Sequence, residues 1–89
     1  MEIITKSQFE RDIKKLKKRQ KNFKKLEVVL SKLISNTELE VKYKNHALVG
    51  NWRPCYELHI EPDWLLIYFI DKENDCLILY RTGTHSDLF

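Results

Sequence analysis

Hydrophobic and polar residues follow one period in the first part of this chain and another in the second. Between residues 7 and 36, apolar residues recur every three or four positions, the spacing of one face of an α-helix. From Cys55 onward the period changes to two, as in Tyr56, Leu58 and Ile60, which alternate with polar neighbours and predict a half-buried strand. The pattern therefore predicts an α+β protein.

Two amphipathic helices are expected before residue 37. The first has an apolar stripe of Phe9, Ile13 and Leu16. Ser7 and Glu10 have the spacing of a capping box at its start. The second helix follows a break near residues 20–22, with Asn22 as its N-cap and Asn36 as its stop. Its stripe consists of Phe23, Leu26, Val29, Leu30, Leu33 and Ile34. Because the joint is short, the two helices are expected to form an αα-hairpin.

Four strands complete the predicted fold. Ile3 and Ile4 open the chain in a short β-like stretch, and the other three strands cover residues 55–60, 65–70 and 76–82. The expected order is β-α-α-β-β-β, with an N-terminal helical hairpin packed on one face of a mainly antiparallel four-stranded sheet. Residues 1–89 are expected to form one domain, since domains usually have about 100–200 residues. The apolar run at 65–70 predicts a central strand that leaves apolar surface on the sheet face away from the helices: Leu66, Tyr68 and Ile70, or their alternates.

Charge is distributed unevenly along the chain. Residues 1–40 hold eleven Lys and Arg against six Asp and Glu, a balance of +5, and residues 41–89 hold five against seven, a balance of −2. The extreme is residues 11–25, where nine basic residues face one acid, Asp12. Such a patch attracts polyanions by neutralising phosphates and releasing counterions. A solvated helix face explains the same pattern, and charge alone does not separate the two interpretations.

Composition excludes several classes of protein. No apolar run reaches the ~18 residues of a membrane-spanning helix, and residues 1–6 lack the order of a signal peptide. With only Cys55 and Cys76 there is no disulfide framework, so two reduced, buried thiols in a cytoplasmic protein are expected. There is no Gly-rich phosphate loop, no serine in a nucleophile-elbow context and no Cys beside a base, which leaves covalent catalysis without support.

The predicted strand order brings ionisable residues to one end of the sheet. If the last three strands form a meander, the end of the first (His59), the following turn (Asp63) and the end of the third (Arg81 to His85) meet at the same edge. His46 lies on a loop that topology does not place. These residues have three interpretations: unrelated surface side chains, acid–base catalysts of RNA cleavage, or metal ligands. Histidine suits the second because its reference pKa, about 6.5, is near neutral. No short metal-ligand spacing supports the third.

Four segments of the sequence together resemble the YafQ branch of the RelE toxin superfamily. They are Lys44-Asn45-His46, Gly50-Asn51-Trp52, His59-Ile60-Glu61-Pro62-Asp63-Trp64 and the C-terminal run from Arg81-Thr82-Gly83-Thr84-His85 to Phe89. The resemblance covers the whole chain. It implies the toxin of a bacterial type II toxin–antitoxin pair, with a metal-independent RNase activity that cuts mRNA in the ribosomal A site. It also implies a cytoplasmic protein that a cognate antitoxin neutralises by direct binding and that contacts operator DNA only in complex with this antitoxin.

Carried over by position, the resemblance assigns the site residues. The catalytic set is His46, His59, Asp63, Arg81, His85 and Phe89. Within it, the histidines and Asp63 transfer or direct protons, Arg81 contacts the phosphate, and Phe89 positions the nucleotide or the tail. The basic helices become a face for ribosomal RNA. The RNA- or ribosome-binding set is Lys14, Lys15, Lys17, Lys18, Arg19, Lys21, Arg53 and Trp64. Stacking on bases and burial in the core are two equally open interpretations of Trp52 and Trp64. No cofactor and no metal is expected.

One position departs from the family. The family often has an Arg three residues before its second histidine, and Tyr56 stands there, on the apolar side by strand parity. Tyr56 carries no charge, so this position supplies no second cation for the phosphate. Arg53 is a basic residue nearby, and nothing in the sequence shows that it takes the place of the Arg. Two other functions stay open. One is a non-catalytic RNA- or ribosome-binding module, and the other is a ParE-like toxin that poisons a topoisomerase but needs no histidine cluster.

Overall fold

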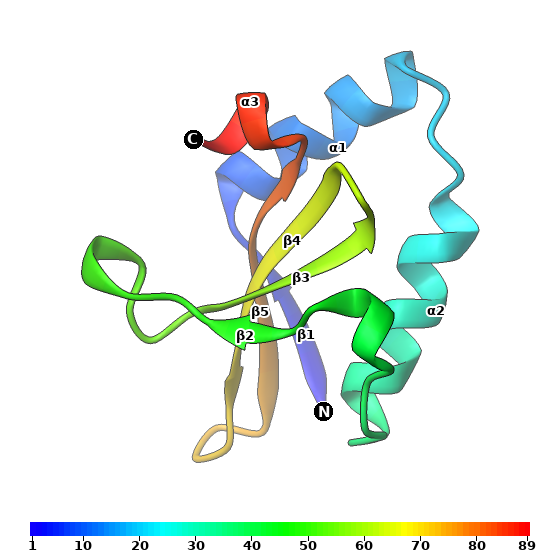
Figure 1. Cartoon of the computed structure of the whole chain (residues 1–89). Helices are drawn as coiled ribbons and strands as arrows, with labels where there is room; N and C mark the ends of the chain where they lie inside the picture. Colours follow the sequence, from blue (N-terminus) through cyan, green and yellow to red (C-terminus); the bar gives the residue numbers. More distant parts are fainter.

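A five-stranded sheet with two helices on one face makes up the chain, as Figure 1 shows for a computed structural model that describes residues 1–89. The elements are β1 (Glu2–Thr5), α1 (Ser7–Lys18), α2 (Phe23–Ile34), the 3₁₀ helix η1 (Val41–Tyr43), β2 (His46–Ala47), the 3₁₀ helix η2 (Gly50–Trp52), β3 (Tyr56–Glu61), β4 (Trp64–Asp71), β5 (Cys76–Gly83) and α3 (His85–Leu88). The strand order is β1-β5-β4-β3-β2, in which only β1 and β5 run parallel. The predicted α+β class is confirmed.

Two short elements extend the predicted layout. The fifth strand is β2, only two residues long, which pairs with β3 so that His46 lies opposite Glu57. The C-terminal residues, expected as a tail, form the single-turn helix α3. Both elements lack a hydrophobic period long enough to be read from sequence. Both nevertheless carry histidines of the predicted site.

The start of α1 differs from the expected one. Lys6 still has extended backbone and its N–H bonds to the sheet, so the helix begins at Ser7 itself. The capping box predicted for Ser7 and Glu10 is therefore wrong, since Lys6 occupies the cap position and provides no side-chain hydrogen bond. In α2 the prediction is confirmed: the side chain of Asn22 accepts a hydrogen bond of 3.1 Å from the N–H of Lys24.

The helices cover one face of the sheet with their apolar stripes. α1 packs on β5 and α2 packs beside β3. At the centre of this layer Trp64 is fully buried. Its indole N–H donates to the hydroxyl of Thr82 at 2.9 Å, and that hydroxyl donates in turn to the carbonyl of Leu65 at 2.7 Å. A buried polar pair of this kind is satisfied on both sides and fixes the register of β4 against β5.

The opposite face of the sheet is covered by the chain's own loops. Leu65 and Ile67 point there and are fully buried. The residues packed over them are Leu48, Trp52, Cys55 and Leu88. Leu66, Tyr68 and Ile70 lie on the helix side instead. The predicted open apolar patch is therefore wrong for the centre of this face, because residues 48–55 and α3 fold back over it.

The two cysteines are free and buried, as expected. Burial raises the pKa of both thiols and so disfavours the reactive thiolate. None of the helices has the length and apolar character needed to cross a lipid bilayer.

Candidate active site

His59, Asp63 and His85 meet at one end of the sheet, as the meander predicts. They come from the end of β3, the β3–β4 turn and the first residue of α3. The rings of His59 and His85 lie with their centroids 5.6 Å apart. Nδ1 of His85 is 2.6 Å from Oδ1 of Asp63. Consecutive antiparallel strands alternate in direction, so this convergence follows from connectivity.

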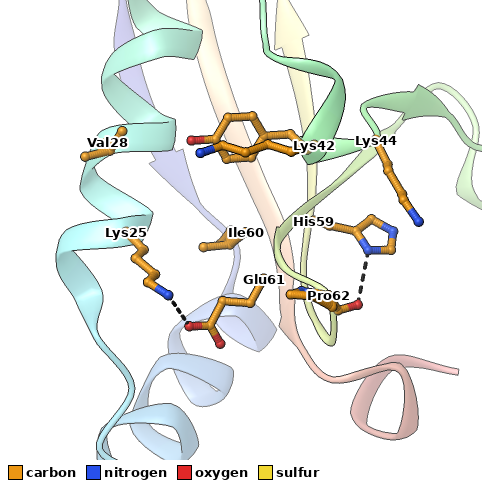
Figure 2. Close-up of a pocket in the computed structure, with 9 residues that line it drawn as sticks. Lys25, Val28, Lys42, Lys44, His59, Ile60, Glu61 and Pro62 are labelled. Carbon is orange, nitrogen blue, oxygen red and sulfur yellow. Dashed lines mark hydrogen bonds and ion pairs between the residues drawn. The ribbon is translucent and has the colours of Figure 1, made fainter.

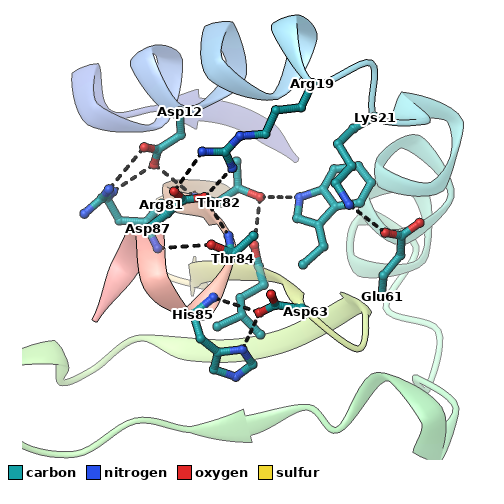
Figure 3. A network of polar contacts seen from close by, with 12 residues as sticks. Asp12, Arg19, Lys21, Glu61, Asp63, Arg81, Thr82, Thr84, His85 and Asp87 are labelled. Carbon is teal, nitrogen blue, oxygen red and sulfur yellow. Dashed lines mark hydrogen bonds and ion pairs between the residues drawn. The ribbon is translucent and has the colours of Figure 1, made fainter.

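Asp63 fixes the orientation of His85. Its Oδ1 accepts both the backbone N–H of His85, at 2.9 Å, and the Nδ1–H of the ring (Figure 3). The backbone bond, and then the ring bond, hold the pKa of Asp63 below its usual value, so the carboxylate is ionised. An ionised carboxylate only accepts hydrogen bonds, so Nδ1 carries the proton and Nε2 of the neutral ring is free. His85 has a half-exposed side chain, and Nε2 is open to substrate.

The other two histidines are oriented by backbone carbonyls. Nδ1 of His46 lies 2.6 Å from the carbonyl oxygen of Lys44, and Nδ1 of His59 lies 3.2 Å from that of Pro62. A carbonyl oxygen only accepts, so each Nδ1 donates and each Nε2 is left for chemistry. All three imidazoles therefore have Nδ1 engaged and leave Nε2 without a hydrogen bond.

Glu57 links His46 to His59. Its Oε1 lies 3.6 Å from Nε2 of both rings, and its side chain is only 9% exposed. Either contact becomes an ion pair when that imidazole is protonated. The groups thus form a row of His85, His59, Glu57 and His46, in which one carboxylate lies between two imidazoles. Sequence analysis missed Glu57, although its spacing of two from His59 placed both on one face of a strand.

Arg81 does not join this row. Its Nε and Nη2 donate to the two carboxylate oxygens of Asp12 on α1, at 2.8 and 3.1 Å, and Asp12 is 2% exposed. This ion pair raises the pKa of Arg81, chiefly through the hydrogen bonds. No hydrogen bond or ion pair connects Arg81 to the imidazoles, because its guanidinium is turned toward Asp12. Only Nη1 is free of hydrogen bonds.

The single-turn helix α3, which begins with His85, is held at its start by Thr84 and near its end by Asp87. Thr84 and Asp87 form a reciprocal capping box, with the Thr84 hydroxyl 3.1 Å from the Asp87 N–H. Asp87 also accepts two hydrogen bonds from Arg19 at the end of α1 (Figure 3). Gly83 has φ +155°, and a Cβ there would lie 2.9 Å from the Asp87 carboxylate. Glycine is needed for the chain to approach this carboxylate closely.

Phe89 packs against the loop on the other side of the sheet. Its ring lies edge-to-face with Trp52, 6.3 Å between centroids, and 63% of the residue is exposed. Its backbone N–H donates to the carbonyl of His85 at 2.9 Å. The pair offers an exposed aromatic surface next to α3.

The predicted RNA-binding residues separate into three groups. Lys14, Lys15, Lys17, Lys18 and Arg53 are exposed and make no hydrogen bond or ion pair. Arg19 is bound to Asp87, and Lys21 donates to Glu61 at 3.0 Å. Trp64 is fully buried, so its predicted stacking on bases is wrong. The amphipathic pattern could not show this, because an indole serves a core and an RNA surface equally well.

Tyr56 lies on the helix side of the sheet, as parity predicts, but it is 42% exposed and packs beside Tyr68. It brings no positive charge to the site. No group of three or more His, Cys, Asp or Glu side chains is placed to hold a metal ion.

Comparison with known proteins gives one consistent result. Residues 1–89 match the family described as "Bacterial toxin of type II toxin-antitoxin system, YafQ". The mRNA interferase toxin YafQ of Escherichia coli (strain K12) is 44% identical over 84 residues, which cover 92% of this chain and 88% of that protein.

Two solved structures extend the likeness to the whole fold. A metal-bound toxin from Helicobacter pylori superposes with a TM-score of 0.93 at 39% identity, covering 100% of this chain and 99% of that one. The toxin–antitoxin complex of DinJ and YafQ from E. coli gives a TM-score of 0.88 at 39% identity, over 99% and 96% of the two chains.

Proposed function

The chain belongs to the YafQ family of bacterial type II toxins, and we propose that it is a ribosome-dependent mRNA endoribonuclease that cleaves in the A site. The observation that carries the proposal is the Asp63–His85 pair, with His59 5.6 Å from His85 between ring centroids. Three imidazoles with oriented Nε2 atoms suit proton transfer better than binding alone. The E. coli relative, an mRNA interferase by name, supports the same activity.

In the proposed mechanism, one imidazole removes the proton of the ribose 2′-hydroxyl and another protonates the leaving 5′-oxygen. The 2′-oxygen forms a bond to phosphorus while the bond from phosphorus to the 5′-oxygen breaks, giving a 2′,3′-cyclic phosphate and a 5′-hydroxyl. His85 and His46 fit these two roles, because their side chains are 55% and 51% exposed and reachable by RNA. His59, at 15%, connects them through Glu57.

The other residues of the predicted catalytic set assist this proton transfer. Asp63 holds the tautomer and orientation of His85 and stabilises its protonated form. Phe89, with Trp52, positions the nucleotide. Arg81 reaches the phosphorane only through Nη1, since Asp12 occupies its other nitrogens. No step passes through a metal.

The proposed partners are the ribosome with its mRNA and a cognate antitoxin, in the cytoplasm. Operator DNA is contacted only through the complex with the antitoxin. The toxin–antitoxin complex of the E. coli relative supports the antitoxin. The exposed lysines of α1 support a contact with ribosomal RNA.

The experiment that tests the function is expression from a tightly controlled promoter, followed by mapping of mRNA 5′ ends with and without translation. We expect new 5′ ends only on translated mRNA, and their loss in His85→Ala. Cleavage in EDTA, at concentrations that leave ribosomes intact, tests the metal-free mechanism. Toxicity that His85→Ala leaves intact, without new mRNA ends, would instead indicate a binding module or a topoisomerase poison.

A further inference from the structure

A cleft of about 390 Å³ lies between α2, η1 and the end of β3, on the side of the site not occupied by α3. Figure 2 shows the residues that line it: Lys25 and Val28 on α2, Lys42 and Lys44 at η1, and His59 near the end of β3. The volume falls within the range of small-ligand sites, roughly 300–1,000 Å³. The cleft therefore has room for one nucleotide.

The lining of the cleft is positively charged. It contains three lysines and one carboxylate, Glu61, which already accepts hydrogen bonds from Lys21 at 3.0 Å and Lys25 at 2.7 Å. These bonds hold the pKa of Glu61 below its usual value and neutralise its charge. The net charge of the lining thus comes from the η1 side of the cleft.

Lys44 is the free cation of this cleft. Lys42 is 3.8 Å from Glu40 and lies over the Tyr43 ring at 5.2 Å, whereas the exposed ammonium of Lys44 makes no ion pair or hydrogen bond. The backbone of Lys44 has left-handed dihedral angles, φ 49° and ψ 41°, and its carbonyl holds Nδ1 of His46. Lys44 therefore orients one imidazole with its backbone while its side chain lines the same cleft as His59.

The proposed reaction needs a cation at the scissile phosphate, and of the two expected ones one is absent and the other is partly occupied. Arg81 is paired with Asp12, and Tyr56 replaces the family's Arg. Charge developing on the phosphoryl oxygens needs a positioned positive group. Of the lysines in the cleft, Lys44 is the one without a competing carboxylate.

We propose that this cleft binds the nucleotide adjacent to the scissile phosphate, with Lys44 against that phosphate and Lys42 against the next one. The inference rests on the proposed ribonuclease function. The apolar side chains of Val28 and Ile60 form the wall against which the ribose or base packs. The ligand class is the single-stranded RNA backbone, read by charge and not by sequence.

Direct RNA binding tests the proposal separately from cleavage. The protein is prepared with His85→Ala, which is expected to remove toxicity, and titrated with a short single-stranded RNA across a salt series. Against this background, Lys42→Gln with Lys44→Gln is expected to weaken binding about tenfold and to lower the log–log salt slope by ~0.7 for each lost phosphate contact. Lys6→Gln with Lys72→Gln is the matched control, of equal charge change at exposed lysines outside the cleft, and is expected to change binding of this short RNA less.

The position of the ligand is tested by NMR. Addition of the RNA is expected to shift the methyl signals of Val28 and Ile60, and Lys44→Arg is expected to restore affinity lost in Lys44→Gln. Unchanged affinity and slope in the double variant, or methyl shifts confined to Leu48 and Leu88 on the other face, would overturn the proposal. If RNA binds in the cleft but the unmodified protein cleaves no mRNA, the proposed binding site stands and the proposed ribonuclease function is rejected.

Discussion

The guanidinium of Arg19 holds the carboxylate of Asp87 through two hydrogen bonds, of 2.6 and 3.0 Å, between residues 68 positions apart. Asp87 also caps the helix that begins with His85. Arg19 therefore belongs to the support of the catalytic turn, although its place in a basic run first suggested RNA binding. A bidentate Arg–carboxylate pair fixes direction as well as distance.

Loss of this pair is expected to lower activity more than it disturbs the fold. Arg19→Gln releases α3 from α1, so we expect about a tenfold loss of cleavage, because a small misplacement of a catalytic group is costly. Lys72→Gln, at an exposed position of the β4–β5 turn without a partner, is the control for the loss of one positive charge. Equal cleavage rates for the two variants, with matching circular dichroism, would show that α3 is positioned without Arg19.

The docking of α3 is expected to survive mild acid and fail only at low pH. Arg19 holds the pKa of Asp87 far below its usual range, and the backbone N–H of His85 lowers that of Asp63. Folded pKa values below the unfolded ones mean that this stabilisation is complete above the ordinary carboxyl value, about 4. It disappears as the pH falls through the lowered values. NMR signals of Leu88 followed from pH 7 to pH 2 measure the transition; undocking near pH 6 would contradict it.

Glu57→Gln is expected to slow cleavage without unfolding the protein. Glu57 Oε1 lies 3.6 Å from Nε2 of both His46 and His59, and the uncharged amide weakens its hold on the two rings, so we expect a loss of up to about 10²-fold. Glu73→Gln, in the exposed β4–β5 turn, is the control for loss of one negative charge. An unchanged cleavage rate would restrict Glu57 to a packing role.

Substitutions of the last two residues, Leu88 and Phe89, are expected to have opposite effects on stability and cleavage. Leu88 is 8% exposed in the cluster with Leu65 and Ile67, so Leu88→Ala is expected to cost about 2–3 kcal/mol of unfolding free energy. Phe89 is largely exposed, so Phe89→Ala is expected to reduce cleavage with little change in stability. Urea denaturation and cleavage assays on both variants measure the contrast. A destabilised Phe89→Ala protein would make the terminal ring structural.

The exposed lysines of α1 are expected to act only through charge. Replacing Lys14, Lys15, Lys17 and Lys18 by Gln should weaken ribosome binding and lower its log–log salt slope by about 0.7–0.9 per lost phosphate contact. Thermal stability should barely change, since exposed substitutions usually stay within about 0.5 kcal/mol. A salt slope equal to that of the unmodified protein would identify this run as a solvated face.

The sequence by itself determined the α+β class, the two amphipathic helices and the meander. These features depend on hydrophobic periodicity, which is a local property of each segment of the sequence. The meander also determined that His59, Asp63 and His85 meet, because alternating strand direction leaves no other arrangement of these ends.

The tertiary structure alone decided what surrounds those residues. The pairing of β2 with β3 brought Glu57 between His46 and His59, and the docking of α1 turned Arg81 toward Asp12. Trp64 became core because the two helices pack over its face of the sheet, with Phe23 of α2 edge-to-face against its ring. Each of these outcomes depends on distances of a few ångströms between segments far apart in the chain. Residue type and spacing carry no information about such distances until the elements are packed together.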